Sequence, residues 1–182
     1  VDISYCENSH IRRANWLKLN MAYSKIDVER STALMVLSKY SKLYTEVGNS
    51  VVAESKYDDY KLGVLDKFII ETKYSDCSID KLQNRLEAEM KYTDMEVEKI
   101  PASFSVIDLD AQYGEVELGI EEGASYRLDA DVQYADVEYP ASDRVQIEQG
   151  HTDKRVKGYI GSANNPEARI SVVTRYCDVE LD

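Results

Sequence analysis

Apolar and polar residues alternate along most of the chain, and the alternation is organised around tyrosines. Before a tyrosine, apolar side chains occupy every second position, as at Ala88 and Met90 before Tyr92. A period of two residues is typical of a β-strand with one buried face. After the tyrosine and two small or acidic residues, the apolar positions resume with the opposite parity, as at Met95 and Val97. A straight strand keeps its parity, so the pattern predicts a sharp corner at each tyrosine.

These tyrosines recur at nearly constant intervals. The successive spacings are 18, 17, 17, 17, 18, 21, 21 and 42 residues, for Tyr5, Tyr23, Tyr40, Tyr57, Tyr74, Tyr92, Tyr113, Tyr134 and Tyr176. We interpret the last interval as two steps of 21, with a degenerate unit in "VQIEQGHTD" and His151 near the place of the missing tyrosine. Two short strands per repeat predict a coil of a β-solenoid, in which equivalent residues stack about 4.8 Å apart. We therefore expect the tyrosines to form a ladder along one corner of the core.

The repeat runs through the whole chain without a linker. A chain of 182 residues has the size of one ordinary domain, and its three prolines and eight glycines form no flexible hinge. The predicted fold is all-β: a single-domain right-handed parallel β-helix (β-solenoid) of about nine or ten short coils over residues 1–182. The handedness follows from the general rule for parallel connections.

Charged residues form rows on the outward positions. The residue before the tyrosine is a lysine in four successive units, Lys39, Lys56, Lys73 and Lys91. Two positions earlier the chain carries Glu54, Glu71, Glu89, Asp110 and Asp131. We expect the basic row and the acidic row to pair across strands on an exposed face, where such pairs contribute little to stability.

A second group of carboxylates, the acidic strip, follows the corner. Its members are Asp94, Glu96, Glu98, Glu115, Glu117, Asp136, Glu138, Asp178, Glu180 and Asp182. We interpret the strip as a solvated face, with a loose calcium site and a catalytic role as the alternatives. Acid–base catalysis needs one carboxyl whose pKa is shifted by its surroundings, and no residue of the strip is singled out in this way.

One outward row is interrupted by apolar residues. Five residues before the tyrosine most units carry a polar residue, but three successive units carry Met35, Val52 and Ile69, and Leu37 lies beside them. Stacked in neighbouring coils, these four side chains would form an apolar patch on a charged surface. Either the segment "CENSHIRRANW" with Trp16 folds over the patch, or the patch binds a partner or a second copy. The four residues are the candidate partner-binding residues.

Composition and spacing argue against several functional classes. A formal charge of −12 disfavours binding to nucleic acids and to anionic lipids, and no apolar run reaches the roughly 18 residues of a membrane helix. We expect no cofactor, no metal site and no catalytic residue, since His10 and His151 lack metal-ligand spacing. Cys6, Cys77 and Cys177 are several coils apart, too far for a disulfide.

Two coil ends carry a resemblance to known proteins. "AQYGEVELGI" (111–120) and "ARISVVTRYCDVELD" (168–182) resemble coil ends of bacterial adhesin families of unknown function, including the auto-transporter adhesin head GIN domain. The resemblance implies a short-coil parallel β-helix in an exported bacterial protein, periplasmic or at the cell surface. It implies no catalytic residue. Because the chain starts at Val1, we expect a leader to have been removed.

The predicted function is a non-enzymatic, adhesin-like binding or structural module. A protein partner, a glycan or a second copy would bind through an outer sheet face. The alternative is a carbohydrate-active β-helix enzyme or a glycan-binding protein. A groove in which carboxylates and aromatic side chains converge would favour this alternative, whereas a smooth column favours the module.

Overall fold

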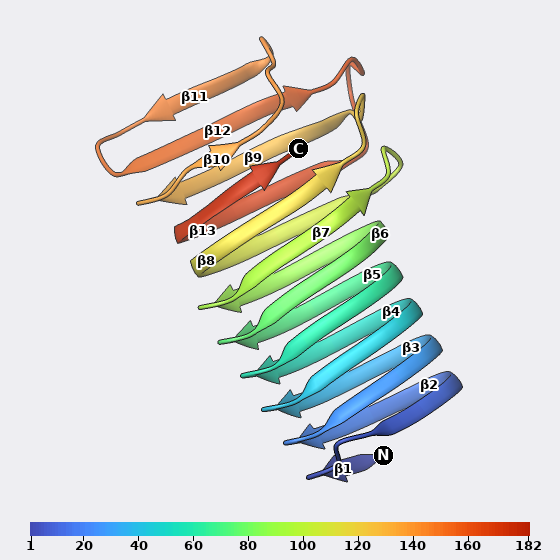
Figure 1. The fold of residues 1–182 in the computed structure, drawn as a ribbon. Helices are drawn as coiled ribbons and strands as arrows, with labels where there is room; N and C mark the ends of the chain where they lie inside the picture. The colour runs from blue at the N-terminus through green and yellow to red at the C-terminus, as the bar shows by residue number, and fades with distance from the viewer.

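The protein is a tower of stacked β-strands, which the computed structural model describes from residue 1 to residue 182 (Figure 1). The strands are β1 (Asp2–Ser4), β2 (Ser9–Ala22), β3 (Lys25–Lys39), β4 (Lys42–Lys56), β5 (Asp59–Lys73), β6 (Asp76–Lys91), β7 (Asp94–Ile100), β8 (Val106–Ile120), β9 (Tyr126–Gln133), β10 (Val137–Glu138), β11 (Val145–Gln149), β12 (Asp153–Ile160) and β13 (Arg169–Leu181). No helix long and apolar enough to cross a membrane is found. The all-β prediction is confirmed.

Strands β2 to β6 stack in parallel and in the order of the sequence. Their register places Leu34 beside Val51 and Val51 beside Phe68, so residues 17 apart in sequence are neighbours in space. Each long strand curls around one side of the tower and returns toward the edge at which the strands end (Figure 1). The predicted β-solenoid is therefore confirmed, with about seven turns. The tyrosine count suggested nine or ten, but the coils at the two ends are incomplete.

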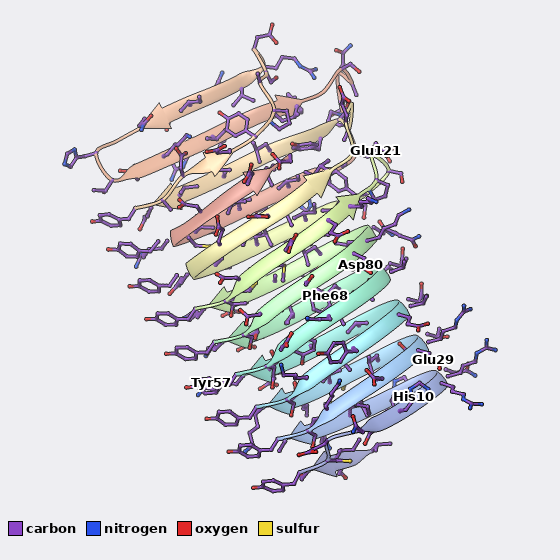
Figure 2. The ribbon with its side chains drawn as sticks, viewed as in Figure 1. His10, Glu29, Tyr57, Phe68, Asp80 and Glu121 are labelled. Carbon is purple, nitrogen blue, oxygen red and sulfur yellow. The ribbon has the colours of Figure 1, made fainter.

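A single apolar core runs along the inside of the tower. It contains 45 buried side chains, and Phe68 lies within it in Figure 2. In β6, Ala88 and Met90 are buried while Glu89 between them is exposed; beyond the corner, Met95 and Val97 are buried in β7. The change of parity at the corner is thus confirmed.

The tyrosines of the repeat lie outside this core. All nine have a left-handed backbone conformation, with φ between 50° and 59°, and their side chains are 40–80% exposed. Their rings stack in sequence, with centroids 4.7–5.2 Å apart, and Figure 2 shows them projecting from one edge of the tower, Tyr57 among them. The prediction of a ladder is confirmed, but its place in the core is wrong. Each tyrosine occupies the apex of a corner, where its side chain points away from the interior.

The corner is held by the buried residue that follows the tyrosine. In five coils this residue is Ser24, Ser41, Asp58, Ser75 or Thr93. The hydroxyl of Ser41 donates to the Lys39 carbonyl (2.9 Å) and accepts from the backbone N–H of Ser24 in the coil below (3.2 Å). The same two contacts recur in other coils, so a column of hydroxyl groups satisfies backbone groups that the turn would otherwise leave buried and unpaired.

The far end of the tower departs from the order of the sequence. Strand β13 lies between β8 and β9 and runs parallel to both, with Val172 beside Leu109 and Ala130. Beyond β9, β12 and β11 form an antiparallel hairpin that covers the end of the stack (Figure 1). The tyrosine ladder accordingly continues from Tyr113 to Tyr176 and then to Tyr134.

Two predictions change with this order. The segment around His151 is not a degenerate coil but the exposed turn of the β11–β12 hairpin, since an alternating pattern predicts a strand without fixing its direction. Cys77 and Cys177 lie three coils apart, whereas the order of the sequence predicts about five; three coils are about 14 Å at the usual strand spacing. This distance still forbids a disulfide, and all three cysteines are free, as predicted.

Substitutions of Tyr74 test how ring stacking and the strain of the left-handed backbone each affect stability at the corner. Ala removes two ring-stacking contacts and is expected to cost about 1 to 3 kcal/mol, whereas a buried tyrosine would cost about 3 to 5 kcal/mol. Gly removes the same contacts but adopts the left-handed conformation without strain. Tyr74→Gly should therefore be more stable than Tyr74→Ala by roughly 0.5 to 1 kcal/mol in urea denaturation. The opposite order would show that residue 74 does not keep its left-handed conformation.

Candidate functional site

The apolar patch predicted from the sequence forms one surface on the pre-tyrosine face, the sheet made of residues that precede each tyrosine. The strand register stacks Met35, Val52 and Ile69 directly, and Leu37 lies next to them. Met35, Leu37 and Val52 are 37–39% exposed, and Ile69 is partly exposed. No other segment of the chain covers them.

Of the two alternatives for the patch, internal cover by the segment "CENSHIRRANW" is not found. Residues from Ser9 onward form β2, a regular coil in register with β3, because their alternating pattern is itself that of a strand. Trp16 is 67% exposed in that coil, where the strand register places it beside Ala33 of β3. The patch is therefore an open surface.

Carboxylates border the patch. The same shallow groove that contains Val52 and Ile69 continues past Glu87 and Glu89 to Asp108 and Asp110. Arg85 pairs with Glu87, but the other acidic residues of this groove have no cation partner. The surface is thus apolar at one end and negatively charged at the other.

The expected pairing of the lysine row with the acidic row is not found. Lys39, Lys56, Lys73 and Lys91 make no ion pair, and Lys56 instead lies over the ring of Tyr57, 5.3 Å from its centroid. On the last coils, the hairpin supplies the cations: Arg155 pairs with Asp131 (2.6 Å) and Lys157 pairs with Asp129 (3.2 Å).

The acidic strip lies on the opposite, post-tyrosine face. Asp94 aligns with Glu115 and Asp178 in neighbouring coils, and Glu96 aligns with Glu117 and Glu180. Crowding by other carboxylates, Asp182 first, raises the pKa of Glu180. No group of three or more His, Cys, Asp or Glu side chains lies close enough to hold a metal ion.

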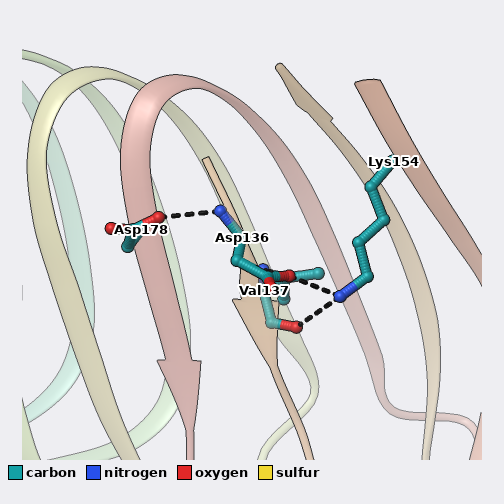
Figure 3. Close-up of polar contacts among 4 residues, drawn as sticks. All are labelled: Asp136, Val137, Lys154 and Asp178. Carbon is teal, nitrogen blue, oxygen red and sulfur yellow. Dashed lines mark hydrogen bonds and ion pairs between the residues drawn. The ribbon is translucent and has the colours of Figure 1, made fainter. Parts of the chain in front are cut away.

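A basic residue, Lys154, lies at the end of the acidic strip next to the hairpin. The Lys154 ammonium donates to the Asp136 carboxylate and to the Val137 carbonyl (3.3 Å), as Figure 3 shows. Asp178 in turn accepts the backbone N–H of Asp136 (2.7 Å). The hydrogen bond from Lys154 lowers the pKa of Asp136. These contacts join β10, β12 and β13, so their role is to fix the end of the tower.

A buried polar cluster beneath the corner was not predicted. Asp58 occupies a position that is Ser or Thr in the neighbouring coils, and its carboxylate accepts from the backbone N–H groups of Ser41 (2.6 Å) and Lys56 (3.0 Å). It also accepts from the Ser38 hydroxyl (2.8 Å), which leaves the Tyr60 hydroxyl to donate to Ser38 (2.6 Å). Burial raises the pKa of both Asp58 and Tyr60. The sequence signal was present, namely one acidic residue in a row of hydroxyl residues.

No hollow in the structure brings these groups together as a catalytic site would. The depressions on the surface are shallow and open, and each follows one sheet face or edge. The Asp58 cluster is buried under the corner and the aromatic rings of the ladder stack on one another. The depression on the post-tyrosine face is lined by carboxylates and by Tyr60, but the Tyr60 side chain is almost fully buried.

Comparison with known proteins places the chain in a family. The model of the family Toastrack DUF4097 matches residues 37–182, which is most of the chain and all of the coils from β4 onward. No curated protein and no solved structure matches significantly. The match supports the expected β-helix family of unknown function; the resemblance to adhesin heads is not shown.

Asp58 provides a test of the buried cluster through the dependence of stability on pH. Its pKa is raised in the folded state, so folding is favoured by the protonated carboxyl. This stabilisation is present at low pH and is lost as the pH rises above the ordinary value of 3.8 through the folded pKa. Asp58→Ser should therefore lose less stability than the wild type between pH 4 and neutral pH, measured by denaturation across a pH series.

Asp58→Asn is the matched control because it removes the charge and keeps the size. Its pH dependence should be flattened in the same way. Its amide NH2, however, faces the backbone N–H of Lys56, and the variant should be less stable than Asp58→Ser at neutral pH by about 1 kcal/mol. Parallel pH curves for the wild type and both variants would exclude a titrating Asp58.

Proposed function

Because the chain belongs to the Toastrack DUF4097 family of β-solenoids, we propose that it is a non-enzymatic binding module that holds a protein partner on its pre-tyrosine face. The observation that carries the proposal is the uncovered apolar patch of Met35, Leu37, Val52 and Ile69. Exposed apolar surface of this kind is typical of interaction sites.

The charge around the patch indicates the character of the partner. Glu87, Glu89, Asp108 and Asp110 extend the same groove, and most of these carboxylates are unpaired. A partner that contributes apolar side chains with Lys or Arg at its rim would bury the patch and pair the carboxylates. Apolar contact at the centre and charges at the rim is the usual composition of a protein interface.

The same geometry supports a binding module over a carbohydrate-active enzyme. The patch lies on a rigid sheet whose coils repeat the same backbone, and the surface presents rows of like side chains in place of a cleft. Such a surface suits an extended contact. We also place the protein outside the cytoplasm, as an adhesin-like module of the bacterial surface or periplasm, on the resemblance of its coil ends alone.

Site-specific photocrosslinking in the producing cells tests the proposal. A photoreactive residue at Val52 should yield one major protein adduct, and Met35→Glu introduced with it should reduce that adduct at least about tenfold by placing a charge in the contact. A photoreactive residue at Glu96, exposed on the post-tyrosine face, is the control and should not give the same adduct.

The purified partner should then bind the wild type and lose at least about tenfold in affinity for Val52→Glu. Val52 is exposed, so Val52→Glu should unfold at nearly the same denaturant concentration as the wild type. Equal adducts at positions 52 and 96, or unchanged affinity for Val52→Glu, would refute a binding site on this face.

A further inference from the structure

The tyrosine ladder is a second surface that the proposed binding face does not use. It consists of Tyr5, Tyr23, Tyr40, Tyr57, Tyr74, Tyr92, Tyr113, Tyr176 and Tyr134, in that spatial order. The ladder runs along the whole tyrosine edge of the tower (Figure 2). Tyrosine is among the residues most enriched at protein interfaces, and here it forms a continuous exposed row.

The backbone shows that this row is costly to maintain. A left-handed conformation is unfavourable for a tyrosine, whereas Gly or Asn would adopt it readily. The chain nevertheless places tyrosine there nine times, with side chains that remain 40–80% exposed. Stacking of the rings offsets part of this strain, but it leaves 40% or more of the surface of each tyrosine exposed. Repeated strain at an exposed position points to a role in binding.

The charges on the two sides of the ladder are opposite in sign. On the pre-tyrosine side the flanking residues include Lys56, Lys73, Lys91 and Arg175, none of which forms an ion pair. On the post-tyrosine side the flanking residues of the same coils are Asp59, Asp76, Asp94 and Asp178. Of these, only Asp59 pairs with a cation, Lys42 (2.9 Å).

We propose that a second copy of this chain binds along the tyrosine ladder, with the two towers parallel and related by a two-fold axis that runs along them. The ladders then face each other at equal levels, because rotation about an axis along the towers leaves each coil at its own height. This symmetry places the basic flank of one copy opposite the acidic flank of the other. Lys73 of one copy faces the second copy's Asp76, and Lys91 faces its Asp94.

The opposite orientation of the towers is unfavourable. A two-fold axis perpendicular to the towers would bring lysine flank against lysine flank and aspartate flank against aspartate flank. Like charges at an interface cost affinity, so the charge pattern selects the parallel arrangement. Only the coil of Tyr40 places lysines opposite each other, Lys39 and Lys42, and Lys42 already pairs with Asp59.

Molar mass measured by light scattering over a dilution series tests the dimer. The wild type should approach twice its 20.7 kDa at high concentration. Lys73→Asp places two carboxylates opposite each other on both sides of the interface and should raise the dissociation constant at least about tenfold. Adding Asp76→Lys exchanges the two charges and should restore dimerisation.

Lys67→Asp is the matched control, since Lys67 is exposed on the same face, away from the ladder, and makes no ion pair. This variant should dimerise like the wild type. A wild type that stays monomeric at every concentration overturns the proposal. So does a dimer that responds equally to Lys73→Asp and Lys67→Asp.

Cysteine crosslinking distinguishes the two orientations. In a Cys6→Ser background, Tyr23→Cys should form a disulfide between copies, because parallel towers place residue 23 opposite itself. In antiparallel towers residue 23 would face residue 176, and only the middle of the ladder, at Tyr74, would meet itself. Crosslinking of Tyr74→Cys without crosslinking of Tyr23→Cys therefore overturns the parallel arrangement. Loss of the Val52-dependent partner would leave these results unchanged, since the ladder lies on a different surface.

Discussion

Parallel stacking of strands at the spacing of backbone hydrogen bonds is the constraint from which the rest of the structure follows. Each residue lies directly beside its equivalents in the coils above and below. The side chains of a row must therefore pack favourably against one another. Apolar rows give the core, and hydroxyl rows connect the corners through Ser24, Ser41 and Ser75. Tyrosine rows stack their rings. Rows of like charge fit only where water can screen them, and they accordingly lie on the outer faces.

Asp58 shows what the constraint permits inside the tower. A carboxylate replaces a hydroxyl in the corner column, and the surrounding coils adapt by donating from Ser38, Ser41 and Lys56. Because the donors are polar groups and none is a cation, burial still disfavours its ionised form. The column therefore tolerates one such residue, whereas the exposed acidic strip tolerates many.

The same constraint separates the surfaces of the tower into independent units. The apolar patch lies on a flat sheet face, and the tyrosine ladder lies on the edge between the two faces. The ends of a solenoid need a separate cover, because the stack would otherwise leave strand edges exposed there. Here the β11–β12 hairpin and the inserted strand β13 complete one end, held by Lys154, Asp136 and Asp178. The outward rows on the sides can thus differ from coil to coil without changing the fold.

The sequence by itself determined the strands, the coil repeat, the inward rows and the four residues of the patch, because all of these depend on local alternation repeated at a constant interval. It could not show that the tyrosines face outward. In the alternation that precedes the corner, the residue at the apex falls on the same set of positions as the inward-facing residues. It could not order β8, β13 and β9, because their registers are equivalent and either neighbour fits the same row. Only the tertiary structure decided the order of these strands and left the patch uncovered. It also brought residues from neighbouring coils together in the Asp58 cluster. All three features depend on contacts between segments that lie apart in the sequence, and local alternation does not encode such contacts.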